Sequence, residues 1–170
     1  MSSRPITVAV LTVSDRCSRG QAVDTSGPAL CQVVREKLGG QVAATACVAD
    51  VPDSISYQLR QWSSDPAPDL ILTTGGTGLA PHDVTPEATR RVLEREHPGL
   101  IQLMQMRCYA KTPLTFLSRG VAGTLNGTLV INLPGSRKGA TECFEALLDV
   151  LPHAIATMRG EVKDHGQAAR

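Results

Sequence analysis

The segment that decides the fold is Leu70–Gly78, which reads Leu-Ile-Leu-Thr-Thr-Gly-Gly-Thr-Gly. Its first five residues form a short apolar run, which is typical of a strand that is buried on both faces. The glycines that follow, Gly75, Gly76 and Gly78, let the chain turn tightly and leave backbone N–H groups open to a ligand. The sequence therefore predicts a buried strand that ends in a glycine loop at the carboxyl edge of a sheet.

Similar apolar runs alternate with helical patterns on both sides of this segment. Ile6–Val13 and Val42–Val48 are predicted strands, and Val121–Leu125 and Thr128–Leu133 form a predicted hairpin with a tight turn at Asn126–Gly127. Helices are expected over residues 29–38, 53–62, from 85 onward, and over about 100–108, 139–150 and 152–158. This alternation predicts an α/β, doubly wound three-layer fold, with a mostly parallel mixed sheet and helices on both faces.

Residues typical of helix ends support these helices. Pro28 and Gly39 stand where a helix would begin and end, because proline suits the first turn and glycine suits the residue after the last. Asp53 and Thr85 have side chains that cap helix N-termini, and Pro86 follows at a first helical position. We therefore expect Asp53 and Thr85 to be N-caps.

The length and charge of the chain indicate how many domains it forms and which partners it can bind. Its 170 residues fit one ordinary domain, which we expect at 1–160, with a polar, frayed tail at 161–170. The 17 Lys and Arg against 16 Asp and Glu leave a net charge of +1, and aromatic residues make up 3%. Because nucleic-acid binders usually carry a basic excess or aromatic stacking surfaces, we expect no nucleic-acid partner.

The sequence also bears on the cellular compartment. No apolar stretch approaches the roughly 20 residues that span a bilayer, and Arg4 leads into a predicted strand instead of a signal peptide. The five cysteines are widely spaced, without a Cys-x-x-Cys pair, which argues against a disulfide framework or a zinc site. We therefore expect a cytoplasmic protein with no membrane partner, whose cysteines are reduced thiols, mostly in the core.

Four polar loops would meet at the carboxyl edge of such a sheet, where ligands of doubly wound folds bind. They include Ser14–Arg16, Asp50–Asp53, Gly75–Gly78 and Asn132–Ser136. Gly75–Gly78 is a candidate phosphate cradle, although a tight strand-to-helix turn would explain the same residues. It lacks the Gly-Lys-Ser/Thr of a Walker A motif, and no Gly-x-Gly-x-x-Gly follows the first strand.

Asp53 and Asp83 are the candidate acids of these loops. Mg²⁺ is usually held by one or two carboxylates together with phosphate oxygens and waters, so this pair could serve nucleotide chemistry. Each acid has a plainer alternative, since Asp53 could simply cap its helix and Asp83 could be a solvated loop residue. His82 is a weaker candidate base or metal ligand, and Arg119 and Lys138 could neutralise phosphates or simply face solvent.

Seven stretches, in one order along the chain, carry a resemblance to a known family. They are Leu11–Asp15, Asp24–Gly27, Val51–Asp53, Leu72–Gly78, Asp83–Ala88, Leu117–Arg119 and Ile131–Ser136. Together they resemble the molybdopterin adenylyltransferase family, the MoaB/Mog type that also forms the G domain of gephyrin. One such stretch would be a coincidence, whereas the ordered set is highly specific. One departure is His82, where Arg is expected in many close members.

The resemblance implies an ATP- and Mg²⁺-dependent transfer of AMP to the terminal phosphate of molybdopterin, with release of pyrophosphate, in molybdenum cofactor biosynthesis. It also implies a homotrimer, and handover of the product to a molybdenum-insertion protein. It assigns Asp53 and Asp83 as the catalytic and Mg²⁺-binding acids. It assigns the nucleotide to Gly75, Gly76, Thr77 and Gly78, and molybdopterin to Ser118, Arg119, Pro134, Gly135, Ser136 and Lys138.

Two alternatives keep the same fold. A non-catalytic molybdopterin-binding paralogue or scaffold module would carry the pterin without adenylating it, although the presence of both Asp53 and Asp83 favours an active enzyme. A nucleotide pyrophosphatase would consume a nucleotide with no pterin present. Adenylyl transfer needs no side-chain nucleophile, because the attacking phosphate is already anionic, so neither Ser118 nor a cysteine is assigned a covalent role.

Overall fold

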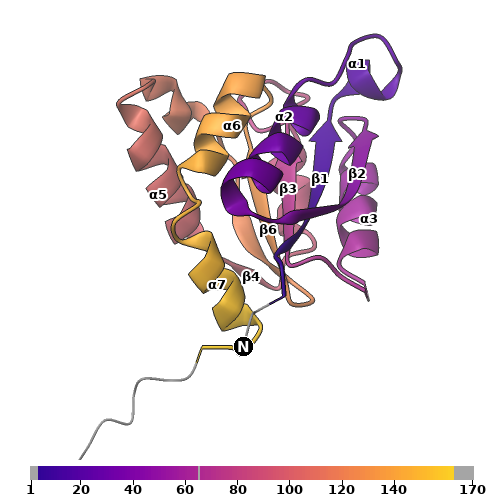
Figure 1. Ribbon diagram of the computed structural model, residues 1–170. Coiled ribbons are helices and arrows are strands. Elements are labelled where there is room, and N and C mark those ends of the chain that lie inside the picture. Colours follow the sequence, from indigo (N-terminus) through magenta and orange to yellow (C-terminus); the bar gives the residue numbers. More distant parts are fainter. Residues whose placement is uncertain (1–3, 65, 163–170) are drawn as a thin grey trace, which may run out of the picture.

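The computed structural model describes residues 4–64 and 66–162, and Figure 1 shows their arrangement. Six strands form one sheet in the order β2-β1-β3-β6-β5-β4. The strands are β1 (Thr7–Val13), β2 (Gln41–Val48), β3 (Leu70–Thr74), β4 (Arg95–Glu96), β5 (Ala122–Leu125) and β6 (Thr128–Leu133). Strands β1, β2, β3 and β6 are parallel, whereas β5 pairs antiparallel with both β6 and β4. The expected mixed sheet is therefore confirmed. Most of the predicted tail, from residue 163 on, lies outside the described residues.

Helices cover both faces of the sheet, as a doubly wound fold requires (Figure 1). One face carries α2 (Ser26–Val33), α5 (Pro98–Tyr109), α6 (Arg137–Glu145) and α7 (Leu151–Met158), whose buried side chains form one cluster with the central strands. The other face carries α3 (Pro52–Trp62) and α4 (Thr85–Arg90), which form a second cluster. Among the described residues, no helix has the length and apolar character that crossing a membrane would require.

The central strands contribute to both clusters because successive side chains on a strand point to opposite faces. In β3, Leu70 and Leu72 belong to the first cluster and Ile71 belongs to the second. All three side chains are fully buried. Burial on both faces explains why this strand is apolar throughout, without the alternation of a half-exposed strand.

The predicted turns are confirmed by the backbone angles. Asn126 and Gly127 have φ of 47° and 77°, the positive values that a two-residue hairpin turn of type I′ requires. Gly39, with φ of 67°, ends the helical segment that continues α2 as the π-helical turn η1 (Val34–Leu38). Glycine suits that position because a left-handed residue there has no Cβ to clash.

Two predicted caps are wrong. Helix α3 has Val51 as its N-cap and Pro52 as its first residue, so Asp53 lies inside the first turn. Proline has a fixed φ that suits the first helical position, which moves the cap one residue before it. Helix α4 begins at Thr85 with Val84 as N-cap. The Thr85 hydroxyl is buried and donates to the glycine loop, so it is not available to the helix.

The sequence missed three short elements and overextended one helix. The missed elements are α1 (Asp15–Ser18), the edge strand β4 and the 3-10 helix η2 (Pro113–Leu117). Helix α6 ends at Glu145, earlier than the predicted Val150. Elements of two to five residues have too few positions to show a period, so they depend on tertiary contacts.

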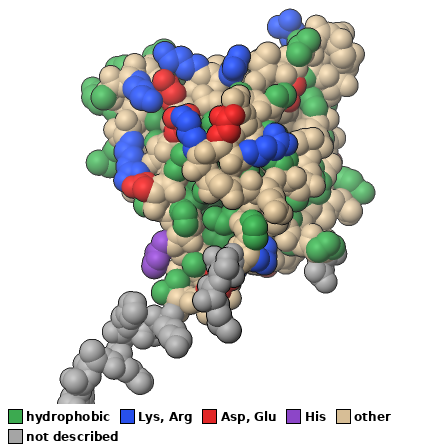
Figure 2. All heavy atoms as spheres, viewed as in Figure 1, with side chains coloured by type: hydrophobic (Ala, Val, Ile, Leu, Met, Phe, Trp, Pro, Cys, Tyr) green, Lys and Arg blue, Asp and Glu red, His purple; other side chains and the backbone are tan. Residues whose placement is uncertain are grey.

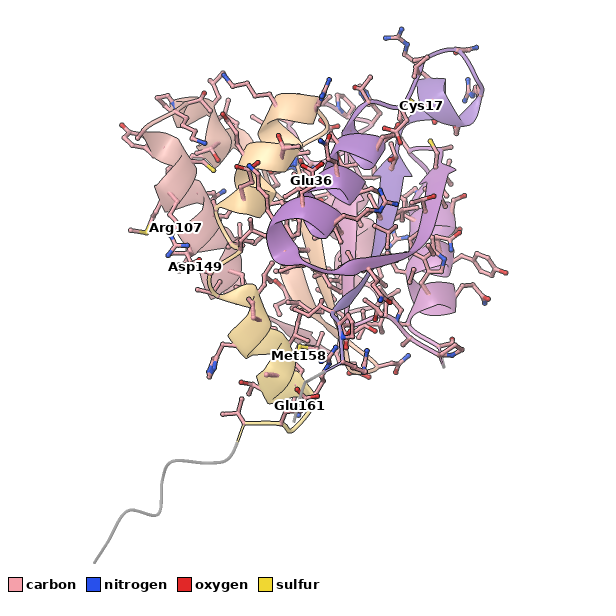
Figure 3. All side chains as sticks on the ribbon, viewed as in Figure 1. Cys17, Glu36, Arg107, Asp149, Met158 and Glu161 are labelled. Atoms are coloured by element: carbon pink, nitrogen blue, oxygen red, sulfur yellow. The ribbon has the colours of Figure 1, made fainter. Side chains whose placement is uncertain are left out.

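Ion pairs join η1 to α6, and α5 to the turn between α6 and α7. Lys37 bonds to Glu145 at 2.7 Å, and Arg107 reaches Asp149 at 2.5 and 2.9 Å. Figure 3 shows Arg107 and Asp149 facing each other, and Figure 2 shows positive and negative side chains intermixed on the same face of the molecule. Such exposed pairs contribute little stability individually, about 0–1 kcal/mol.

A buried carboxylate ties distant parts of the chain together. Asp69, with a side chain 5% exposed, accepts hydrogen bonds from Arg4 (2.8 Å), Arg159 (2.7 Å) and the amide and hydroxyl of Thr7 (2.8 Å each). Burial acts to raise the pKa of Asp69, but the hydrogen bonds from Arg159 and Thr7 and the Arg159 charge together hold it well below its ordinary value. The charged carboxylate therefore links the start of β1, the start of β3 and the end of α7.

We predict that Asp69→Asn lowers the free energy of unfolding by about 3 kcal/mol at neutral pH, because it removes one partner of a buried ion pair. The folded pKa of Asp69 is depressed, so this contribution is present above about pH 4 and declines as the pH falls below it. Urea unfolding at pH 7 and pH 3 measures both effects, and the difference between variant and wild type should shrink at pH 3. Arg4→Ala, at a more exposed partner, should cost less. An Asn variant as stable as wild type at pH 7 would contradict the prediction.

Candidate functional site

The glycine loop after β3 is packed so tightly that side chains are excluded. A Cβ added at Gly75, where φ is 105°, would lie 2.2 Å from the carbonyl oxygen of Val13. One added at Gly76, where φ is 64°, would lie 2.4 Å from the Thr85 hydroxyl oxygen. At Gly135, a Cβ would approach the Gly75 Cα to 3.1 Å. The loops after β3 and β6 therefore lie in contact, beside the end of β1.

Hydrogen bonds fix these loops to one another. The Gly75 amide donates to the Leu133 carbonyl at 3.2 Å, and the Thr74 hydroxyl donates to the Pro134 carbonyl at 2.7 Å. The Thr85 hydroxyl donates to the Gly75 carbonyl at 2.8 Å. These bonds set β3, β6 and the start of α4 in one arrangement at the carboxyl edge of the sheet.

A cleft of about 320 Å³ opens at this edge. We call it the glycine-loop cleft; its lining comes from the loops after β1, β2, β3 and β6 and includes Ser14, Asp50, Gly76, Asp83 and Gly135. The sequence predicted that these loops would meet. Backbone N–H groups beside glycines and helix starts are suited to anions, so the cleft can receive phosphate groups.

Three acids line the glycine-loop cleft: Asp24, whose carboxylate accepts from Thr12, Ser26 and Gly27, and Asp50 and Asp83. One oxygen of Asp83 accepts from the Ala80 amide at 2.9 Å. Asp50 and Asp15 exchange hydrogen bonds, each carboxylate accepting from the other's backbone amide at 2.8 and 3.0 Å. Sequence reasoning passed over Asp50, although its place two residues after β2 was a usable signal.

Asp53 is placed differently from Asp83. Its side chain is 96% exposed, pairs with Arg91 at 3.6 Å, and is not part of the cleft lining. The first turn of a helix favours a carboxylate, which accounts for an acid at this position. The structure therefore does not bring the two acids of the resemblance together in the cleft, and the catalytic role of Asp53 stays a prediction.

The carboxylates of the glycine-loop cleft could bind Mg²⁺ only if a nucleotide supplied further oxygen ligands. No group of three or more His, Cys, Asp or Glu that could hold a metal occurs among the residues described. The carboxylates of Asp50 and Asp83 supply the hard oxygen atoms that Mg²⁺ prefers, and phosphates and waters commonly complete its shell. The cleft is thus suited to a cation that arrives with ATP.

A second cleft, of about 340 Å³, lies between the end of α5, η2 and the start of α6. We call it the α5–α6 cleft; its lining includes Leu114, Thr115, Pro134, Ser136 and Lys138. Ser136 also caps α6, accepting from the Gly139 amide at 3.1 Å. The 134–136 loop borders both clefts, because Gly135 lines the first while Pro134 and Ser136 line the second.

The cysteines are free thiols. The sulfur atoms of Cys108 and Cys143 lie 3.9 Å apart beside the α5–α6 cleft. Burial, helped by Cys108, raises the pKa of Cys143 to about 12, and burial with neighbouring Cys17 and Asp24 raises the pKa of Cys47 to about 11. These two thiols are therefore protonated at neutral pH, which does not suit a nucleophile.

The remaining predicted site residues line neither cleft. The Ser118 hydroxyl donates to the Thr77 hydroxyl at 3.2 Å. The Arg119 guanidinium donates to the carbonyls of Gly78 and Asp83 and to the carboxylate of Glu87. Hydrogen bonds thus link Ser118 and Arg119 to Thr77, Gly78 and Asp83 in the loop after β3.

Known proteins resemble this chain over most of its length. The family model described as "Probable molybdopterin binding domain" matches residues 9–153. The molybdopterin adenylyltransferase of Helicobacter pylori strain J99 is 40% identical over 156 residues, covering 91% of this chain and 89% of that protein. The chain belongs to the MoaB/Mog family of molybdopterin-binding domains. Membership of this family makes it a transferase of molybdenum cofactor biosynthesis.

Other members of the MoaB/Mog family are similar to this chain in structure or in sequence. The MoaB enzyme of Thermus thermophilus has a TM-score of 0.86 at 51% identity, covering 91% of this chain and 97% of that one. The Drosophila melanogaster "Molybdenum cofactor synthesis protein cinnamon" is 43% identical over 157 residues. This chain spans only 26% of the length of cinnamon.

We predict that Gly75→Ala prevents normal folding or destabilises the protein by more than about 1–3 kcal/mol, because φ is positive and the Cβ meets backbone. Gly99→Ala, in α5, is the matched control: its Cβ meets open space, and alanine should stabilise the helix by about 0.5–1 kcal/mol. Thermal unfolding of both variants measures the difference. Equal stability of the two variants would contradict the crowding at Gly75.

Proposed function

We propose that the protein transfers AMP from ATP to the terminal phosphate of molybdopterin, giving adenylyl-molybdopterin and pyrophosphate. The observation that carries the proposal is the 134–136 loop, which borders two clefts of different character in a chain of this family. Two substrates in adjacent clefts, with their phosphates meeting at this loop, suit a transfer between them.

The glycine-loop cleft would bind ATP. Gly75, Gly76 and Gly135 line it without side chains, so phosphate oxygens can approach the backbone amides. Thr77 and Gly78 do not line the cleft and would contribute through the shape of the loop. His82, at the rim position where Arg is expected in many close members, also lines this cleft.

The α5–α6 cleft would bind molybdopterin. Leu114 and Pro134 give it apolar surface for a planar ring, whereas Ser136 and Lys138 can interact with the phosphate. Lys111, which also lines this cleft, lies 3.6 Å from Glu142. Lysine is a common phosphate binder, so the charge of Lys138 beside the 134–136 loop supports this orientation of the substrate.

The chemistry requires positioning and charge stabilisation. The molybdopterin phosphate would attack the α-phosphorus of ATP in line, and pyrophosphate would leave. Bound Mg²⁺ would neutralise developing charge on the phosphates. Asp83 would hold the cation or its waters at the edge of the glycine-loop cleft, with Asp53, as the resemblance implies, or Asp50 as the second acid. We place the reaction in the cytoplasm, as the sequence without a signal peptide pattern and with widely spaced cysteines suggests.

We predict that Asp83→Asn keeps the fold but lowers pyrophosphate release by about 10²–10³, the usual effect of losing a well-placed electrostatic group. Asp53→Asn and Asp50→Asn, measured in parallel, identify the second acid, since only that variant should show a comparable loss. The assay contains ATP, Mg²⁺ and molybdopterin, and omits each in turn. Normal turnover of a folded Asp83→Asn variant would refute its role.

The same assay separates the alternatives. A transferase needs both substrates for pyrophosphate release, a nucleotide pyrophosphatase needs no pterin, and a binding-only paralogue binds molybdopterin without turnover. The acid at Asp83 beside the cleft favours the transferase.

We also propose a homotrimer, with handover of the product to a molybdenum-insertion protein. The apolar segment Leu100–Met104 is a poor candidate for the interface, because Ile101 and Met104 are buried in the core. Exposed apolar side chains lie instead on α5 and η2. We call Met106, Tyr109, Phe116 and Leu117 the apolar patch; the rings of Tyr109 and Phe116 pack edge to face with their centroids 5.9 Å apart. Exposed apolar groups of this kind commonly mark protein interfaces.

We predict a sedimentation mass three times the 18.0 kDa of one chain. Phe116→Glu should shift the protein toward monomer, because it places a charge in the patch. Tyr57→Glu, at an exposed aromatic of α3 outside the patch, should leave the mass unchanged. A wild-type monomer at micromolar concentration would refute the trimer.

A further inference from the structure

The side chain of Arg119 is engaged by the protein itself. Its Nε donates to the Gly78 carbonyl at 2.8 Å, and one terminal nitrogen donates to the Asp83 carbonyl at 2.6 Å. The other terminal nitrogen bonds to the carboxylate of Glu87 in α4. The Arg119 backbone amide donates to the Thr77 carbonyl at 2.8 Å. One residue thus contacts the start and the end of the 77–83 loop and the helix that follows.

These contacts close the loop across its base. The loop has internal bonds of its own, because the Ala80 amide donates to the Asp83 carboxylate and the Asp83 amide donates to the Ala80 carbonyl. Arginine can satisfy two separated carbonyls and a carboxylate at once, since its guanidinium presents five donors in a rigid fork. Lysine, with one ammonium group on a flexible chain, cannot replace that geometry.

The charge of Arg119 is also compensated. Partial burial acts to raise the pKa of Glu87, but the hydrogen bond and charge of Arg119 outweigh it, so the pKa lies below its ordinary value. The Glu87 carboxylate is therefore ionised at neutral pH and forms a neutral pair with Arg119. A neutral pair outside both clefts is poorly suited to bind a substrate phosphate.

We propose that Arg119 is a positioning residue, which with Glu87 holds the 77–83 loop so that Asp83 faces the glycine-loop cleft. This role replaces the molybdopterin contact that the family resemblance implied for Arg119. It rests on the proposed function for its consequence in catalysis, but the loop geometry can be measured without turnover.

Amide hydrogen exchange and ligand binding test this role in Arg119→Lys, Arg119→Gln and Glu87→Gln. We expect exchange at residues 78–83 to rise about tenfold or more in both Arg119 variants and by less in Glu87→Gln, because the charged hydrogen bonds are lost. The KM for Mg·ATP should rise and kcat should fall, whereas the Kd for molybdopterin should stay within about twofold of wild type. Arg119→Lys should not rescue Arg119→Gln. Arg90→Lys, in the exposed α4 pair with Glu96, is the matched control and should leave all these quantities unchanged.

A direct phosphate contact gives the opposite pattern. Arg119→Gln would then weaken molybdopterin binding with unchanged loop exchange, Arg119→Lys would restore part of that binding, and Glu87→Gln would tighten it by freeing the guanidinium. That pattern, or unchanged exchange in all three variants, would overturn the proposal. If wild type shows no adenylyl transfer, the proposed function fails, but exchange and molybdopterin binding still decide the role of Arg119.

Discussion

The close approach of the glycine loop to its neighbours is the constraint on which the site depends. The backbone at Gly75 passes so near the Val13 carbonyl that a Cβ would lie 2.2 Å from it. Only glycine can occupy this turn between the ends of β1 and β6, because it has no side chain. Because Thr85 bonds to the carbonyls of Gly75 and Gly76, this turn also sets where α4 begins and where Asp83 can stand.

The buried side chain of Asn132 also stabilises the carboxyl edge of the sheet. Asn132 is fully buried in β6, donates to the hydroxyls of Thr73 and Thr89 at 2.9 and 3.0 Å, and accepts from the Val121 amide at 3.2 Å. A buried amide without partners would cost about 1–3 kcal/mol, so these bonds explain a polar residue in an apolar strand. They fix β6 relative to β3, α4 and the segment before β5, and thereby support the loop between the two clefts.

The charges of the site are divided between the two clefts. The glycine-loop cleft has three carboxylates, of Asp24, Asp50 and Asp83, against Arg16, whereas the α5–α6 cleft has Lys111 and Lys138 against Glu142. Arg119, which lines neither cleft, is neutralised by Glu87. This division suits a nucleotide that brings its own cation on one side and an anionic pterin phosphate on the other.

The sequence by itself determined five of the six strands described, the hairpin turn and the fold class, because a strand buried on both faces is apolar throughout and turns need particular residues. It also predicted that the loops of Gly75, Asp83 and Ser136 share one edge of the sheet, since strand order in the chain predicts which loops meet, whereas their division between two ligands came only from the family resemblance. Only the tertiary structure decided which way side chains point: Asp53 toward Arg91 and solvent, Asp50 into the cleft, and Arg119 onto the 77–83 loop. The spacing of residues along the chain carries the periodicity of strands and helices, whereas a side chain's partners come from segments tens of residues away.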